Sequence, residues 1–310
     1  MPTYIGDVIN QCRRDTNNTD VTSISTEDFL RYANYAQENL QAIILQCQSA
    51  KFQFEAYYNI TSGQDAYSLP DNTYMGDRIV NVEYTFTGNA RDYHKIYERG
   101  LAQRSTYPLN YIEAYIRRSG QILVQPMPSA TQGILRVTAE RQIDRLDIRR
   151  GVIDAVTGTT SVTALSLDVA SASYPPSATD IAAIILTNPY ICISDKDGIP
   201  VAYNIPVSAY DAGTGDLTIT ATDTISTPAA GQFITFGKYT RTHTELDIIC
   251  ERYITAYMNW KIFGRDTASA AKAKIFENEL SLIKEELTAS YSETDHDEDE
   301  IQIVHPDLVL

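Results

Sequence analysis

Residues 151–238 differ in composition from the rest of the chain, and this break constrains the fold more than any other feature. The segment contains no Glu, Arg or His, while Thr, Ser, Ala, Ile and Val dominate it. Short apolar runs alternate with turn dipeptides such as Asn188-Pro189 and Asp197-Gly198. Short strands separated by closely spaced turns are typical of a small β-sandwich or barrel.

Four runs in this segment are predicted to be strands, at 184–186, 190–194, 217–222 and 233–236. Helical patterns occur both before and after the segment. We therefore expect residues 151–240 to form a small all-β domain inserted into a helical host, because long surface connections tolerate insertions.

Two amphipathic helices are predicted ahead of this insertion. The first carries apolar residues at helical spacing from Tyr4 to Cys12. The second begins after Ser25, which stands three residues before Asp28 in an imperfect capping box, and its apolar stripe reaches Cys47. Both stripes need a partner to cover them.

Two further helices are predicted after the insertion, at 244–264 and 267–290, and Asp266 or Thr267 is the expected cap of the second. A short link between two helices produces an antiparallel hairpin. The helix that starts after Ser25 is expected to cover this hairpin in a three- or four-helix bundle. Its expected shared core consists of Phe29, Leu40, Tyr253, Trp260, Phe276 and Leu287.

A β-element is predicted between the first pair of helices and the insertion. Its expected strands are 52–60, 65–69, 78–87, 111–117, 121–125 and 133–140. Arg118-Ser-Gly120 is a hairpin turn signal, and the Tyr-rich stretch 93–107 is left unassigned. The fold class is therefore α+β, an antiparallel helix bundle with a β-element, an inserted small all-β domain (sandwich or barrel) and an extended C-terminal arm. The expected segments are 1–150, 151–240, 241–291 and 292–310.

The net charge of −15 and the pI of about 4.6 argue against a protein that binds nucleic acid by neutralising phosphates. Residues 1–150 carry 16 Lys+Arg against 17 Asp+Glu, residues 151–240 carry 2 against 8, and residues 241–310 carry 7 against 15. The acidity therefore lies in the second half of the chain. Residues 1–20 lack the apolar core of a signal peptide, and no stretch reaches membrane-spanning length, so we expect a cytosol-like compartment.

The last nineteen residues combine an acidic run with an apolar tip. Six carboxylates within 293–300 repel one another, which favours an extended and solvated course. The tip is expected to enter another protein, as an added strand or in a groove, and the alternative is a tail folded back on its own domain. The candidate partner-binding residues are Ile301, Ile303, Val304, Pro306, Leu308, Val309 and Leu310.

The sequence offers no constellation that would support catalysis or metal binding. The four histidines have no second His, Cys or Glu at ligand spacing. The stretch from Asp195 to Gly198 is similar to an acidic calcium loop but lacks the bidentate Glu, so an Asp-Gly turn is expected there. Cys12, Cys47, Cys192 and Cys250 are interpreted as reduced core thiols. We expect no cofactor, no metal and no enzymatic activity.

Nine arginines crowd into residues 99–150. They could line a surface that DNA passes, pair with acidic residues of a neighbouring subunit, or form a solvated strand face. Pairing between subunits is the favoured interpretation, because the rest of the chain supplies the opposite charge. The candidate interface residues are Arg117, Arg118, Arg136, Arg141 and Arg145.

Several short motifs follow one another in an order found in a known family. They are Ser25-Thr-Glu-Asp28, Phe52-x-Phe54, the tract from Tyr58 to Tyr67-Ser-Leu-Pro70, Ile79-Val-x-Val82, Gly133-x-Leu-Arg-Val137 with Asp144-x-Leu-Asp147, the helix pair from Glu245 and the C-terminal arm. With this layout the chain resembles the head-to-tail adaptor proteins of tailed phages, also called tail accessory or head-completion proteins. The resemblance covers the chain outside 151–240.

The resemblance implies a structural virion protein made in the host cytoplasm and placed in the neck of the virion. Such a connector forms a ring, with twelve copies expected, between the portal and the tail or nozzle proteins. Its C-terminal arms grip the portal, and DNA passes through the central channel during ejection. The competing class is a β-rich binding module, for carbohydrate or another surface, on a helical stalk, and an enzyme ranks third.

Overall fold

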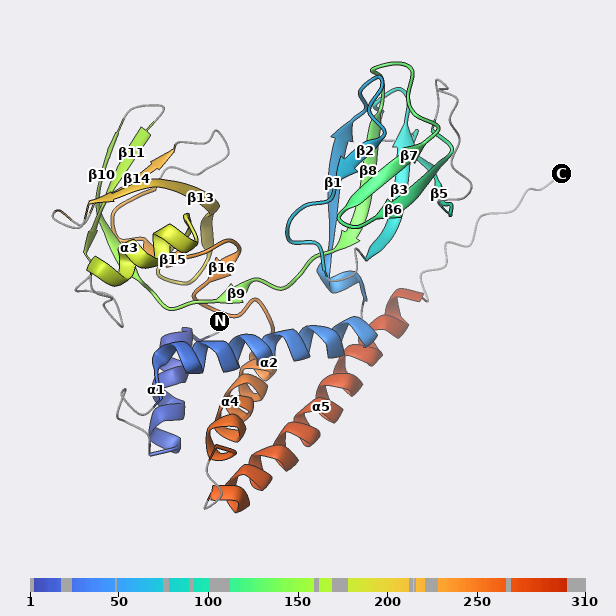
Figure 1. Cartoon of the computed structure of the whole chain (residues 1–310). Coiled ribbons are helices and arrows are strands. Elements are labelled where there is room, and N and C mark those ends of the chain that lie inside the picture. The colour runs from blue at the N-terminus through green and yellow to red at the C-terminus, as the bar shows by residue number, and fades with distance from the viewer. Residues whose placement is uncertain are drawn as a thin grey trace. The chain divides into compact units, whose positions relative to one another are not determined.

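The computed structural model of the chain describes residues 3–17, 24–47, 49–74, 78–89, 92–100, 112–158, 162–168, 178–211, 214, 216–220, 228–265 and 269–299. The chain is a mixed α+β protein with five α-helices and several sheets among these residues (Figure 1). It divides into two compact units. Unit 1 comprises Met1–Ile43 and Ile143–Leu310, and unit 2 comprises Ile44–Gln142.

The four helices expected from the apolar stripes are present. They are α1 (Ile5–Asp15), α2 (Thr26–Cys47), α4 (Ile248–Phe263) and α5 (Ala270–Asp299). The start of α2 has the expected capping arrangement, since the Asp28 amide donates to Ser25 Oγ at 3.1 Å. The proposed caps Asp266 and Thr267 lie outside the described residues.

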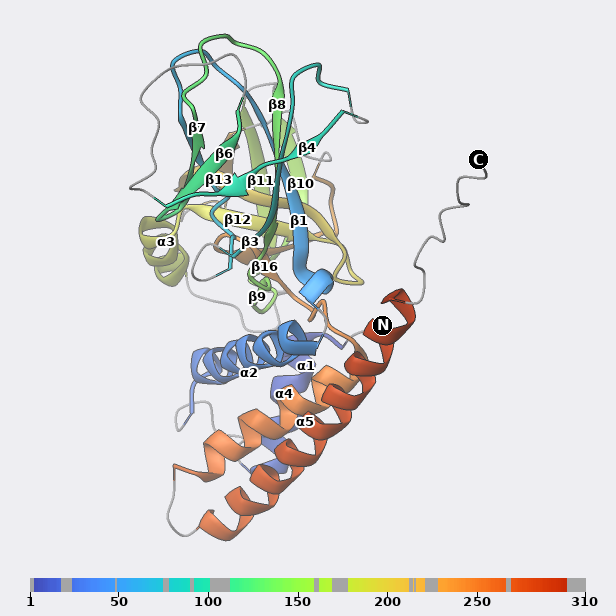
Figure 2. The same ribbon diagram turned by 90° about the vertical axis from the view of Figure 1, so that its right-hand side faces the viewer.

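Helix α4 packs along α5, and the two helices run side by side in both views (Figures 1 and 2). Phe29, Leu40 and Leu287 are fully buried, as expected for core residues. Tyr253 is also buried, whereas Trp260 and Phe276 are only half-buried and lie at the edge of the core, against the rings of Tyr257 and Phe263. The aliphatic Ile262 and Met258 are the buried neighbours on that stretch of α4, and the larger Trp260 ring reaches the surface beside Lys261.

Amide side chains of α2 hold the chain segment that follows unit 2. Asn34 exchanges two hydrogen bonds with the backbone of Leu146, at 2.7 and 3.0 Å. Gln37 donates to the carbonyl of Asp144 at 3.0 Å. Buried amides are tolerated at these helix positions because each satisfies a buried backbone group.

Six strands of the segment 151–236 form a closed barrel with the order β10-β11-β14-β13-β12-β15. The strands are β10 (Gly151–Gly158), β11 (Val162–Asp168), β12 (Tyr190–Ser194), β13 (Pro200–Asp211), β14 (Asp216–Thr220) and β15 (Phe233–Phe236). Three of the four predicted strands correspond to β12, β14 and β15. Aliphatic side chains fill the core, among them Ile153, Ile191, Ile205 and Ile234.

The predicted strand at 184–186 is wrong, because these residues lie in helix α3 (Ala178–Thr187). The segment is therefore not all-β. Ile181, Ile184 and Ile185 fall at helical spacing, and all three pack in the barrel's core cluster. A short apolar run fits a strand or a buried helix face equally well, and here packing against the barrel favours the helix.

The long strand β13 was missed because Pro206 interrupts its sequence pattern. Its first half pairs with β12 up to Pro206, which lies opposite Tyr190, and its second half pairs with β14 from Val207 onward. Proline cannot donate to a β-ladder. It is tolerated at this position because the strand changes partner there.

Unit 2 contains two four-stranded sheets, with the orders β1-β8-β3-β4 and β2-β7-β6-β5. The strands are β1 (Gln53–Asn59), β2 (Ala66–Ser68), β3 (Ile79–Thr85), β4 (His94–Lys95), β5 (Tyr97–Glu98), β6 (Ala114–Arg118), β7 (Gln121–Gln125) and β8 (Ile134–Glu140). Both sheets contribute to one core cluster, which makes the unit a sandwich. The expected strands and the Gly120 turn are present.

The division of the chain differs from the expected segment 1–150. The strands of residues 53–140 form a unit of their own, and the polypeptide enters that unit at Ile44 and leaves it at Gln142. The barrel belongs instead to the same unit as the helices. The short strands β9 (Arg145–Leu146) and β16 (Thr240–Arg241) pair in parallel and join the chain on either side of the barrel.

The C-terminal helix is longer than predicted. Helix α5 continues to Asp299, so the predicted extended arm at 292–310 is wrong for residues 292–299, which are helical. Extending an existing helix needs no new nucleus, and this lowers the cost of helix formation in spite of the like charges. Residues 300–310 lie outside the described residues.

Candidate assembly surfaces

Helix α5 has two faces of different character. Leu280, Ile283 and Leu287 are buried on the face toward α4. Ile275 and Leu282 are each 64% exposed, and they lie seven residues apart, so they share the opposite face of the helix. A helix that belongs to one subunit normally hides such residues or offers them to a partner.

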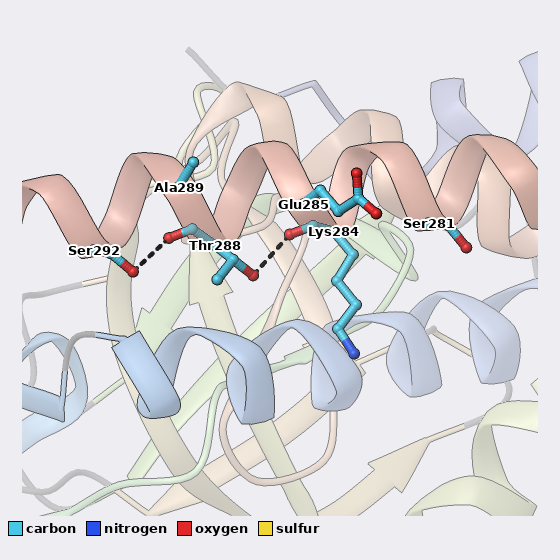
Figure 3. A pocket seen from close by; sticks show the side chains of 6 residues that line it. All are labelled: Ser281, Lys284, Glu285, Thr288, Ala289 and Ser292. Atoms are coloured by element: carbon cyan, nitrogen blue, oxygen red, sulfur yellow. Dashed lines mark hydrogen bonds between the residues drawn. The ribbon is translucent and has the colours of Figure 1, made fainter.

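A groove of about 560 Å³ lies along the polar flank of α5. Figure 3 shows its lining, in which Lys284 extends away from the helix axis and the hydroxyls of Thr288 and Ser292 turn back to the helix. Thr288 donates to the carbonyl of Lys284 at 2.8 Å, and Ser292 donates to that of Thr288 at 2.7 Å. These hydroxyls are already satisfied, so the groove has no preorganised donor set for a small ligand.

The predicted partner-binding tip is not placed by the structure. Ile301, Ile303, Val304, Pro306, Leu308, Val309 and Leu310 all lie outside the described residues. Tyr291 precedes the acidic run in sequence. It is buried, and its hydroxyl donates a hydrogen bond to Asp247 at 2.7 Å. Burial and this carboxylate raise the pKa of Tyr291. Tyr291 thus anchors α5 to the start of α4 immediately before the acidic run begins.

Two of the candidate interface arginines are paired within unit 2. Arg136 on β8 donates from Nε to Glu83 at 2.7 Å, and its guanidinium lies 4.3 Å from the ring centre of Tyr93. Arg117 on β6 forms an ion pair with Glu98 at 3.4 Å. The sequence shows few acids near these residues because the partners come from other strands.

The other three candidates have different surroundings. Arg141 lies over the ring of Phe52, at 5.9 Å from its centre. Arg118 on β6 and Arg145 on β9 are exposed, and neither forms an ion pair with a residue that the structure describes. Arg118 belongs to unit 2 and Arg145 to unit 1. The structure therefore does not bring the five arginines together within one unit.

A buried ion pair that the sequence analysis did not single out joins the helices to the barrel. Arg150 contacts Asp147 through Nη2 at 2.6 Å and Glu27 of α2 through Nη1 at 2.7 Å. Asp147 also accepts the amide of Phe236 on β15 at 2.9 Å. Burial by itself would lower the pKa of Arg150, but the charge of Asp147 and its hydrogen bonds outweigh this and raise it.

The sequence predictions for the acidic turn and the cysteines can be compared with the structure. Asp195 Oδ1 accepts the amides of Asp197 and Ile199 at 2.9 and 2.8 Å, so this stretch is the expected Asp-Gly turn. None of the four cysteines forms a disulfide, and burial raises the pKa of Cys12 to about 12. Within the described ranges, no group of three or more His, Cys, Asp or Glu could hold a metal ion. No described helix has the length and apolar character needed to cross a membrane.

No protein-family model matches the chain, and no curated protein matches it.

Proposed function

We propose that this protein is a structural component of a tailed-phage virion, an adaptor that forms a ring between the portal and the tail. The observation that carries the proposal is the unpartnered face of α5. A thirty-residue helix exposes Ile275 and Leu282 and leads directly to the apolar tip at 301–310. Apolar groups that a single subunit leaves uncovered favour an assembling protein over a monomer.

The modular fold also suits this role. We propose that the helices form a host bundle, that residues 151–240 are a module inserted into it, and that the tip is the arm that contacts the portal. The barrel's interior positions hold aliphatic side chains, so a binding role of this module would use its outer surface. In the proposed ring, Arg145 contacts acidic residues of a neighbouring copy, while DNA only passes through the channel.

The proposal is tested by deleting residues 301–310. Each of the six aliphatic side chains in the tip would contribute about 1.5–3 kcal/mol on burial, before the cost of ordering is subtracted. We expect the truncated chain to stay folded by circular dichroism and to lose attachment to portal particles in a pull-down. Attachment unchanged by the deletion would contradict the role of the arm.

A second measurement concerns the ring. Native mass spectrometry or electron microscopy of the full chain with portal is expected to show a closed ring, with twelve copies as the proposed number. Leu282→Lys is expected to weaken ring formation, and Lys272→Glu on the same helix serves as a control for a change of charge. A chain that remains monomeric with portal present would favour the alternative, a β-rich binding module.

A further inference from the structure

A cleft of about 310 Å³ in unit 1 gathers basic side chains in a chain that is acidic overall. Helix α2, strand β9 and the turn between β15 and β16 contribute to its lining. Four cations line the cleft, against two carboxylates, Glu27 and Asp147. The cations are Arg31, Arg145, Arg150 and Lys238.

The two carboxylates of the lining are engaged by one of its own cations. Arg150 binds Asp147 and Glu27 together, at 2.6 and 2.7 Å. Because one arginine engages both carboxylates, the four cations and two carboxylates of the lining together carry a formal charge of +2. Arg31 pairs outside the lining with Asp28, and Arg145 forms no ion pair with a described residue. The cleft therefore has a net positive charge, with Arg145 as its most available donor.

The lining favours carboxylates over a nucleic acid. Its apolar members Leu30, Leu146 and Phe236 are buried, with the Phe236 side chain only 8% exposed. A nucleobase needs an exposed aromatic face on which to stack, and this cleft offers none of its own. An acidic peptide needs only the guanidinium and ammonium donors.

The chain itself carries a suitable acidic peptide. Residues 293–300 contain six carboxylates, and α5 extends into this run as far as Asp299. The negative end of the helix dipole lies there, so carboxylates at this position are electrostatically unfavourable without a cationic partner. A basic cleft on another molecule would remove this repulsion.

We propose that the cleft around Arg145 binds the acidic run 293–300 of a second copy of this chain. The inference deepens the proposed function, on which it rests, because a ring places identical copies next to one another. Each copy would offer its cleft to one neighbour and its acidic run to the other, which is a head-to-tail contact that can close into a ring.

The test measures binding of a fluorescent peptide with the sequence of residues 292–310. The receptor is the full chain in which the six carboxylates of 293–300 are replaced by their amides, so that its own tail does not compete. We expect binding that weakens when the salt concentration rises from about 0.05 M to about 0.5 M. Arg145→Glu in the receptor is expected to weaken binding about tenfold, because attraction becomes repulsion.

Arg118→Glu is the matched control. Arg118 is also an exposed strand arginine without an ion pair to a described residue, but it lies in unit 2 and does not line the cleft. We expect this variant to bind the peptide as the unaltered receptor does. Circular dichroism of each receptor verifies that it is folded. Equal losses for Arg118→Glu and Arg145→Glu, or no binding of the peptide, would overturn the proposal.

Two further binding measurements distinguish this proposal from its alternatives. A peptide with amides in place of its six carboxylates is expected to lose binding, and retained binding would point to the apolar tip and overturn the assignment. A single-stranded oligonucleotide that binds in an Arg145-dependent manner, while the peptide does not, would make the cleft a nucleic-acid site. Since the peptide assay needs no ring, its failure leaves portal attachment and ring formation to be judged separately.

Discussion

The two β regions of this protein are stabilised in different ways. The core of the sandwich in unit 2 includes the tyrosines Tyr67, Tyr84 and Tyr115 among its aliphatic residues. The barrel core is almost entirely aliphatic, with Ile234 and Leu217 as typical members. Strand pairing stabilises both regions. They differ in whether the core side chains can also form hydrogen bonds.

Tyrosine hydroxyls connect the sandwich core to its loops. Tyr67 accepts the amide of Thr61 at 3.2 Å and donates to the carbonyl of Gln64 at 3.3 Å. Tyr84 donates to the carbonyl of Gln132 at 3.3 Å. A buried tyrosine thus fills the core and satisfies loop backbone groups at the same time.

The barrel has a different connection to its surroundings. Asp147, which is held by Arg150, accepts the amide of Phe236 and so fixes β15 to the segment beside α2. The sandwich instead has half-exposed pairs such as Arg117 with Glu98 on its surface. The buried ion pair beside the barrel is therefore expected to matter for stability, whereas a half-exposed ion pair of the sandwich contributes little.

The largest expected effect comes from removing the charge of Asp147. Asp147→Asn leaves the buried Arg150 with only the partly exposed Glu27, and we expect the free energy of unfolding of unit 1 to fall by about 3–5 kcal/mol. Urea denaturation followed by circular dichroism measures this loss. In the matched variant Glu98→Gln of the sandwich, which removes the half-exposed partner of Arg117, the loss should stay near or below about 1 kcal/mol. Similar losses for the two variants would refute the contrast.

Core truncations should act on one unit at a time. Leu135→Ala in the sandwich and Ile234→Ala in the barrel each remove a fully buried side chain, so each should cost about 2–5 kcal/mol. Because the two residues lie in separate compact units, we expect each variant to lower the protection of its own unit in hydrogen exchange. If Leu135→Ala destabilises the barrel strands by the same amount, the two units unfold together.

A smaller effect is expected for the hydroxyl of Tyr67. Tyr67→Phe keeps the ring in the core but removes the two loop contacts, at an expected cost of about 0.5–1.5 kcal/mol. Thermal unfolding of unit 2 is the measurement, and Tyr97→Phe on the exposed β5 is the control, with no change expected. A larger loss for Tyr97→Phe would contradict the importance of the buried hydroxyl.

The smallest effect concerns pH and His243, whose ring lies against the Gly198 turn of the barrel. Burial and the charge of Arg149 lower the pKa of His243, although Glu251, Asp195 and Asp7 act in the opposite direction. Below the ordinary value of about 6.5, the unfolded chain takes up a proton that the folded chain resists, so stability is lost as the pH falls.

We therefore expect unit 1 to be less stable to urea at pH 5 than at pH 7.5, and His243→Gln to flatten this dependence. Glutamine removes the titrating ring, and the contact of Thr242 with His243 Nδ1 at 2.8 Å is then absent at both pH values. His94 of the sandwich is exposed, so His94→Gln serves as the control. An unchanged slope in His243→Gln would assign the pH dependence to other groups.

Local signals in the sequence were reliable where one element could be identified from its own residues. The stripe from Phe29 to Leu40 and the Ser25 cap predicted α2, and the turn at Gly120 predicted the hairpin of β6 and β7. Elements with mixed signals were not reliable. The run at 184–186 was assigned to a strand, and β13 was hidden by Pro206.

The candidate site was predicted less well than the fold. The sequence identified Arg145 as an interface residue among five arginines, but it grouped that residue with Arg117 and Arg136, whose carboxylate partners Glu98 and Glu83 come from other strands. It also missed the pair of Arg150 and Asp147, which are three residues apart. The spacing of three residues can be read from the sequence, but only the structure shows that both side chains are buried and that the ion pair therefore matters for stability.

The mixed fold class, the four long helices and the strong acidity of the last seventy residues all follow from the order of the amino acids, because periodicity, caps and charge are properties of neighbouring residues. Three other features depend on the folded chain: residues 44–142 form their own unit, the barrel belongs with the helices, and Arg145 opens into a basic cleft. Each of these arises from contacts between residues far apart in the chain, and no local pattern encodes which distant side chains share a core or a charge.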